Sequence, residues 1–480
     1  MEAVCNLSGV GQVAFRYRYR SRGWRMPSSE LVPKEKDGAW AALNEMDLDS
    51  SVDQSSRRHV PAPKSYVVVL ALYAIYALAF SLVIPATPGL VLKLTNYNTS
   101  LSSFYFGAAT STRYIVEFFA APLIGTIADR KGRKTVLLFS FCVCASELFL
   151  LALFPSIPML FLVRILSGLD GTSSTIFTIV TDIASNNGDV VTQKYAYVGA
   201  MFGLAFIVGP LSGGLLSSVS FELCLLVGGL VASVGAVACA LFLEETLPKQ
   251  SGGVDTRAAP MLWAYDALAG SFAAIRLHLS IPRMRQLTLV LVLSTVGGGY
   301  YFNWYMIMNY QFSASAAQVG YYLSFLGVVV VFVNGFLVGA IIPKVWSEVE
   351  ATQYGLVLTA VHVLLLVFCS SQWTLYALSL LFCVQSVYTP ALKAIIVQES
   401  LKQAGAGQFQ GNLQGILTSI GTLSTACAAL LFAALFSLSV SSLHSTYLIF
   451  LVSGGLYLSA AVYFYRLKRG GLGGGDKEAD

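Results

Sequence analysis

The sequence predicts an all-α, polytopic membrane protein with twelve transmembrane helices in two six-helix halves. Apolar residues make up 56% of the chain and charged residues only 11%, whereas a soluble domain carries about 25% charge. The mean hydropathy is +0.68. The 480 residues leave room for about twelve spans of roughly 20 residues and their loops. Loops that carry lysine or arginine also alternate with loops that do not, which indicates how the chain crosses the membrane.

Twelve apolar segments follow a polar, basic tail at residues 1–64. The first six segments occupy residues 65–243, and the second six occupy residues 286–466. A charged loop at 244–285 separates the two halves, and a second polar tail follows at 467–480. We expect the segments at about 66–90, 102–127, 135–155, 158–185, 195–217, 221–243, 286–310, 319–342, 352–370, 373–397, 409–437 and 443–466.

The positive charges support this count independently. Lysine or arginine follows every even-numbered segment, whereas the loops after segments three, five, seven, nine and eleven have neither, and the loop after segment one has only Lys93. Because positively charged loops stay in the cytosol, both termini, the central loop and both tails are predicted to be cytosolic. The net charge of +5 therefore reflects the positive loops that set the orientation of the chain in the membrane. We expect the lipid bilayer as a partner and no nucleic acid.

The residue pattern argues against an enzyme. It contains no nucleotide-binding loop, no metal-ligand spacing and no nucleophile constellation, and seven of the eight cysteines lie inside apolar segments as packing residues. We therefore expect no cofactor and no metal. The polar start of the chain is unlike a cleavable signal peptide. The plasma membrane and an endomembrane or vesicle both fit an integral, multi-pass protein, and we expect a monomer.

A charged run, Gly125–Lys134, reads GTIADRKGRK and follows the second segment. It resembles the loop motif G-x-x-x-D-R-x-G-R-[KR] of the major facilitator superfamily. A small residue at Gly125 allows a close helix approach, and Gly132 allows a tight reversal into the third segment. Asp129 and Arg133 can pair at the cytosolic end.

The resemblance implies a role for this cluster as a cytosolic gate that holds the two halves together in the outward-facing state. Asp182, at the cytosolic end of the fourth segment, is the expected acceptor for Arg130 or Arg133. The alternative is that these charges only anchor the loop at the membrane surface. The expected gate residues are Gly125, Asp129, Arg130, Gly132, Arg133, Lys134 and Asp182.

The fourth segment contains Arg164 and Gly168, which match the family pattern R-x-x-q-G-x-g, whereas Ser167 and Asp170 depart from it. By resemblance, Arg164 takes part in proton coupling. Asp170 is about twelve residues into this segment, which places it about 18 Å deep in a continuous helix. A carboxylate at that depth is either a proton carrier or one half of a buried salt bridge.

The second segment places Arg113 and Glu117 four residues apart and therefore on one helix face. Arg113 lies at about the depth of Asp170, so we predict one buried charge cluster of Arg113, Glu117 and Asp170. Desolvation and pairing change the pKa of a carboxyl in opposite directions, which suits a proton-coupling group. A static structural pair is the alternative. Glu147, in the third segment, receives less weight because third helices are peripheral in the family.

Two further motifs point to a branch of the family. Gly209, Pro210 and Gly213 match the antiporter signature core G-x-x-x-G-P-x-x-G, although Ala205 replaces its first glycine. The signature implies a bend in helix five and antiport; a packing kink without bearing on direction is the alternative. The run at 407–415 resembles the tetracycline-exporter and hippocampus-abundant-transcript branch of drug/proton antiporters.

Helices one, four, seven and ten surround the central cavity in this family. On this chain they carry aromatic, hydroxyl and amide groups, a mixture that suits an amphipathic organic solute. Near Asn309, an aromatic belt at the membrane surface is the alternative. The candidate substrate-binding residues are Tyr73, Tyr76, Ser174, Tyr300, Tyr301, Asn303, Trp304, Gln385 and Tyr388.

The resemblance thus implies a secondary transporter that moves a small organic solute by alternating access. Proton-coupled antiport is the leading expectation, with the proton as second partner. One alternative is a uniporter or symporter for a metabolite, vitamin or organic anion, in which the charge cluster holds substrate. A second alternative is a transporter-like structural or trafficking factor of an intracellular vesicle.

Overall fold

The computed structural model describes residues 63–187, 191–246, 260–333, 345–381, 385–404 and 409–469. These residues belong to one compact unit, and every regular element within them is helical. Most of the predicted tail at 1–64 and most of the tail at 467–480 lie outside the described residues. Residues 407 and 408 of the motif before segment eleven also lie outside them.

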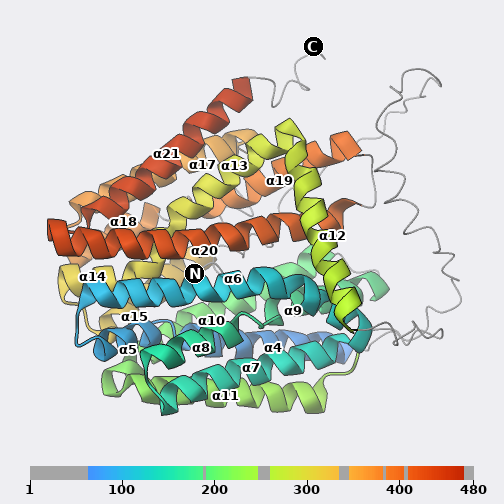
Figure 1. Ribbon diagram of the computed structural model, residues 1–480, viewed down its shortest axis with the longest axis horizontal. Helices are drawn as coiled ribbons and strands as arrows, with labels where there is room; N and C mark the ends of the chain where they lie inside the picture. Colours follow the sequence, from blue (N-terminus) through green and yellow to red (C-terminus); the bar gives the residue numbers. More distant parts are fainter. Residues whose placement is uncertain are drawn as a thin grey trace, which may run out of the picture. The chain divides into compact units, whose positions relative to one another are not determined.

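Among the described residues, the first half contains eight helices, and a further helix, α12, lies in the predicted central loop. Figure 1 shows their arrangement. The first and fourth predicted segments are each divided between two helices. The bounds are α4 Pro63–Leu82, α5 Ala86–Leu94, α6 Thr99–Lys131, α7 Arg133–Leu153, α8 Ile157–Ser167, α9 Thr172–Asn187, α10 Val191–Val219, α11 Phe221–Phe242 and α12 Pro260–Ser280.

The second half is interrupted more often. A 3₁₀ segment, η2, divides the seventh predicted segment, and another, η4, ends the ninth. The bounds are α13 Pro282–Gly297, η2 Gly298–Asn303, α14 Trp304–Phe312, α15 Ala316–Phe332, α17 Glu348–Leu365, η4 Leu366–Phe368, α18 Gln372–Ser379, α19 Gln385–Ala404, α20 Phe409–Leu443 and α21 Tyr447–Arg469.

In the part of the chain that the structure describes, seven helices are long and apolar enough to cross a membrane. They correspond to predicted segments one, three, five, six, nine, eleven and twelve. Among the other predicted segments, the fourth and seventh are interrupted, α6 of the second carries charge at Arg113 and Glu117, and α15 of the eighth is an apolar helix of 17 residues. The helical membrane-protein fold is confirmed, whereas the count of twelve spans stays a prediction. The seven spans are 66–94, 133–153, 197–219, 221–242, 348–368, 415–443 and 447–469.

The fourth segment differs from the continuous helix that we predicted. Helix α8 ends at Ser167 and α9 begins at Thr172. At Gly168 a Cβ atom would lie 2.6 Å from Cβ of Val116 on α6, so only glycine permits this approach. Asp170 therefore lies at a helix break, where the depth calculated for one straight helix does not apply.

The two halves meet along two helix pairs, α6 with α20 and α10 with α15 (Figure 1). Glycines allow both contacts. A Cβ at Gly107 of α6 would overlap Ala433 of α20, and a Cβ at Gly214 of α10 would lie 2.9 Å from Cα of Gly320 on α15. Membrane helices commonly pack with their backbones close together. Lipid gives no hydrophobic driving force between helices, so van der Waals contacts stabilise their association.

The fifth-segment motif packs α10 against α4. A Cβ at Gly209 would overlap the hydroxyl of Ser81, and a Cβ at Gly213 would overlap the carbonyl oxygen of Leu82. Ser81 also donates a hydrogen bond from Oγ to the carbonyl oxygen of Ala205, at 2.9 Å. Helix α10 continues past Pro210 as one element. The glycines therefore have a packing role here, and the bend stays a prediction.

Helix α12 lies in the region that we predicted only as a loop, and it contacts both halves. Its Phe272 ring lies 5.8 Å from the Phe118 ring and 6.3 Å from the Phe119 ring of α6. Six residues further along the same helix, His278 Nε2 lies 2.9 Å from Thr288 Oγ1 of α13. Burial lowers the pKa of His278, which favours the neutral form of its imidazole.

We predict that Gly213→Ala lowers the free energy of unfolding by about 1–3 kcal/mol, because the added methyl group has no space beside Leu82. Thermal unfolding of the purified protein in detergent measures the effect. Gly421→Ala in α20 is the matched control, since nothing lies within 4 Å of a Cβ at that position. Equal melting temperatures for the two variants would contradict the packing role.

Candidate functional site

A cavity lies between the two halves. The first half lines it from α4, α5, α6, α7, α8 and the break before α9, and the second half lines it from η2, α14 and α15. Charged side chains come only from the first half among the residues that line it, whereas the second half supplies aromatic and aliphatic groups. The charged lining residues are Arg113, Glu147, Arg164 and Asp170.

The predicted pair of Arg113 and Glu117 is present on α6. Nε of Arg113 lies 3.9 Å from a carboxylate oxygen of Glu117. The guanidinium carbon of Arg113 also lies 5.8 Å from the ring centre of Phe80 and 5.6 Å from that of Tyr114. Aromatic faces stabilise a cation in this position. Arg113 is thus held by one carboxylate and two rings.

Asp170 occupies the break between α8 and α9. Its Oδ1 accepts hydrogen bonds from the backbone N–H of Thr172 at 2.8 Å and from the Thr172 hydroxyl at 2.6 Å. Its Oδ2 accepts a hydrogen bond from the Tyr76 hydroxyl at 2.6 Å. The carboxylate thus accepts a hydrogen bond from the backbone N–H of Thr172. In a continuous helix, that N–H group would donate to the carbonyl oxygen four residues earlier. Asp170 therefore stabilises the start of α9 and joins it to α4.

Glu147 enters the site from α7, although we gave it less weight in the sequence. It interacts electrostatically with Arg164 and Arg113. Within the described chain, Oε2 of Glu147 and Nε of Arg164 have no hydrogen-bond partner. The cluster that we predicted with three members thus has five, and Glu147 interacts with both of its arginines.

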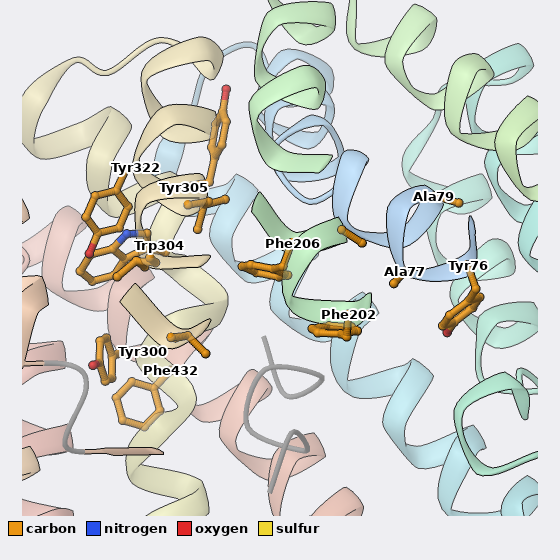
Figure 2. Packing of buried hydrophobic residues seen from close by; sticks show 14 of the residues in the cluster. Tyr76, Ala77, Ala79, Phe202, Phe206, Tyr300, Trp304, Tyr305, Tyr322 and Phe432 are labelled. Carbon is orange, nitrogen blue, oxygen red and sulfur yellow. The ribbon is translucent and has the colours of Figure 1, made fainter. Parts of the chain in front are cut away.

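Three of the candidate substrate residues line the cavity, namely Tyr76, Tyr301 and Trp304. The rings of Tyr301 and Trp304 lie 6.4 Å apart, and Trp304 stacks on Tyr322 at 5.4 Å (Figure 2). Tyr301 and Trp304 belong to the part of the cavity lining that the second half supplies, whereas the charged cluster comes from the first half.

The remaining substrate candidates lie elsewhere. Tyr73 packs between Phe177 and Phe202, and Ser174 donates to the carbonyl oxygen of Gly171. The others are buried in helix contacts or fall outside the described side chains: Tyr300 packs on Phe450, Asn303 accepts from Ser103 of α6, Tyr388 packs on Tyr457, and the side chain of Gln385 is not described.

A second charged cluster, which the sequence predicts at the cytosolic end, forms around Arg133. Its Nε lies 3.1 Å from Oδ2 of Asp182 at the end of α9, and its Nη1 pairs with Asp129 of α6. Both predicted partners are therefore present. Nζ of Lys134 donates to the carbonyl oxygen of Ala240 on α11, at 2.8 Å. These contacts join four helices of the first half, and Arg130 lies exposed beside them.

Glu245, which we did not predict, completes this cluster. Its carboxylate accepts hydrogen bonds from the backbone N–H groups of Arg133 at 2.9 Å and of Lys134 at 3.2 Å, which are the first residues of α7. A Cβ at Gly132, whose φ is +104°, would overlap this carboxylate. Gly125 differs from our expectation, since a Cβ there meets no atom within 4 Å and no close approach occurs.

Residues 69–422 match the Major Facilitator Superfamily. A tetracycline resistance protein, class H, of Pasteurella multocida is 25% identical over 408 residues, which cover 84% of this chain and 97% of that protein. The class D protein of Salmonella ordonez is 28% identical over 400 residues, covering 82% and 94%. Solute carrier family 22 member 18 of Mus musculus is 27% identical over 259 residues, covering 52% and 61%.

Solved structures with the same fold include the human organic anion transporter MFSD10 (TETRAN), with a TM-score of 0.59 at 23% identity, covering 85% of this chain and 100% of that one. The nucleoside transporter NupG gives a TM-score of 0.64 at 15% identity, covering 84% and 99%. Together with the cavity between two helical halves, these matches define an integral, multi-pass membrane transporter of small solutes and not an enzyme. The chain belongs to the Major Facilitator Superfamily.

We predict that Glu245→Ala lowers the free energy of unfolding by about 1 kcal/mol, because two N–H groups at the start of α7 lose their acceptor. Chemical or thermal unfolding in detergent measures this loss. Glu244→Ala is the control, since the neighbouring Glu244 is exposed. An equal effect of both substitutions would exclude a specific capping role for Glu245.

Proposed function

We propose that this chain exchanges a small organic solute for protons by alternating access. The observation that carries the proposal is the set of carboxylates and arginines in the cavity between the halves, above all Glu147 with its free Oε2 among the described residues. Ionisable groups inside a membrane are costly and mark proton or substrate pathways. Relatives that are named for tetracycline resistance support a small organic cargo.

Glu147 is the proposed proton carrier. Both oxygens of Asp170 already accept hydrogen bonds, from Thr172 and from Tyr76, whereas one oxygen of Glu147 has no partner within the described residues. Adding a proton to Glu147 removes its attraction for Arg164 and Arg113 and changes the charge of the whole cavity. Protonation of Glu147 on α7 therefore weakens its interactions with Arg164 on α8 and with Arg113 on α6. Asp170 takes the positioning role at the start of α9.

Tyr76, Tyr301 and Trp304 are the proposed solute contacts. They line the same cavity as the charged cluster, but Tyr76 belongs to the first half and the other two to the second. A solute between them would contact both halves, which is what alternating access requires of a central site. The Arg133 cluster, with Asp129 and Asp182, is the proposed gate at the cytosolic end.

Reconstitution in liposomes tests this proposal. An internal pH dye follows proton movement while amphipathic organic solutes and vitamins are added one at a time. We expect a solute-driven proton flux in the wild type, a flux that falls to the background of empty liposomes in Glu147→Gln, and an unchanged flux in Glu222→Gln, since Glu222 lies outside the cavity and pairs with Lys93. Solute uptake without proton movement would favour a uniporter and contradict the proposal.

Asp170→Asn separates positioning from proton carriage. Because the amide keeps only one acceptor oxygen, we expect a weaker anchor for α9 and a reduced flux that still depends on the pH gradient. The same liposome assay measures both quantities. Loss of the pH dependence in Asp170→Asn, together with its retention in Glu147→Gln, would assign proton carriage to Asp170 instead.

A further inference from the structure

Helix α12 lies across the seam between the two halves. It contacts α6 of the first half and both α13 and α20 of the second, and it runs across the direction of α6 and α20 (Figure 1). Ile281 follows it with an extended backbone, at φ −81° and ψ 116°, so the chain turns there before α13 begins at Pro282. Because α13 begins the predicted seventh segment, α12 lies where that segment meets the membrane surface, on the side that we predict to be cytosolic.

One face of α12 is exposed. Its members recur every three or four residues, which places them on one side of a helix, and they are Ala269, Phe272, Ala273 and Arg276. The side chain of Phe272 is 48% exposed. A Cβ at Gly270, beside this face, would meet no atom within 4 Å. The face is thus apolar except for one arginine, and an exposed apolar face next to a bilayer is a contact surface.

The Phe272 ring reaches the apolar layer of the membrane. It contacts the rings of Phe118 and Phe119 on α6, at 5.8 and 6.3 Å. Phe119 lies eight residues inside the predicted end of the second segment at 127, which is about 12 Å along a helix. Phe119 is itself 47% exposed. The outer sides of both rings therefore face lipid acyl chains.

Two arginines flank the turn at Ile281 and are available for a negative charge. Arg276 lies one turn after Phe272, and Arg285 lies in α13; both are exposed, and neither forms an ion pair within the described residues. Arg283, between them, is already paired with Glu399 of α19, at 3.8 Å. An arginine at a membrane surface lays its aliphatic stem along apolar groups and extends its guanidinium to the headgroups. A guanidinium there binds phosphate through two parallel hydrogen bonds.

We infer that the exposed face of α12 docks on the cytosolic leaflet and binds an anionic phospholipid. Arg276 contacts the headgroup phosphate, and Phe272 packs on the acyl chains. Charge complementarity favours this occupant, because the cytosolic leaflet is negatively charged. A second copy of the chain would instead bring the same unpaired arginines to the contact. The inference concerns the outer surface of the protein and does not depend on the proposed exchange in the cavity.

Photocrosslinking of the full-length protein in nanodiscs tests the inference without any need for transport. The bilayer contains equal parts of phosphatidylcholine and phosphatidylserine. The photoreactive residue p-benzoylphenylalanine replaces Ala273 in one sample. In the control sample it replaces Leu230, which is exposed within the membrane span of α11. Mass spectrometry identifies the molecules that are crosslinked at each position.

At Ala273 we expect phosphatidylserine adducts to outnumber phosphatidylcholine adducts by about fivefold, the factor that one arginine contributes at an anionic surface. At Leu230 the two lipids should be crosslinked equally, since acyl chains alone meet that position. Equal adducts at Ala273, or crosslinks there to a second copy of the protein in place of lipid, would overturn the inference.

Charge variants then assign the preference to Arg276. With the crosslinker at Ala273, Arg276→Gln should bring the two adducts to equal amounts, whereas Arg276→Lys keeps the charge and should keep most of the preference. Arg466→Gln removes one charge from the exposed end of α21 and should leave the preference unchanged. A preference that survives in Arg276→Gln, or that falls equally in Arg466→Gln, would contradict a lipid site on α12.

Discussion

Charge inside a membrane is the constraint on which this structure depends. Five ionisable side chains gather where water is scarce, and each of them needs a neighbour to remain there. Asp170 finds hydrogen-bond donors in Tyr76 and Thr172, and Arg113 finds two rings and Glu117. These contacts explain why α8 and α9 are separated at Asp170 and why α4, α6, α7 and α8 converge on one cavity.

Close backbone packing supplies the rigid frame around this cluster. Gly168 lets the helix break approach α6, and Gly209 and Gly213 bring α10 against α4. The same device joins the halves at Gly107 and Gly214. Tight contacts of this kind have few alternative arrangements, so the halves behave as packed bodies that exchange whole contacts when they move.

Local motifs were predictable from the sequence, whereas contacts across the fold were not. The run at 125–134 correctly predicted the pairing of Arg133 with Asp129, and Asp182 was expected as a partner from its place at the end of the fourth segment. Glu147 received less weight because third helices are peripheral in the family, and one residue in an apolar helix does not reveal its interaction with Arg164, 17 residues further along the chain. Glu245 and α12 were missed for the same reason, since their roles come from segments distant in sequence.

Helix α12 has a consequence for how far the molecule can open. It continues through Ile281 into α13 of the second half, yet its Phe272 lies against Phe118 and Phe119 of the first. Helix α12 thus ties the second half to the first through one aromatic contact. In the exchange proposed above, this contact breaks, or α12 moves with the first half, each time the two halves separate on that side of the membrane.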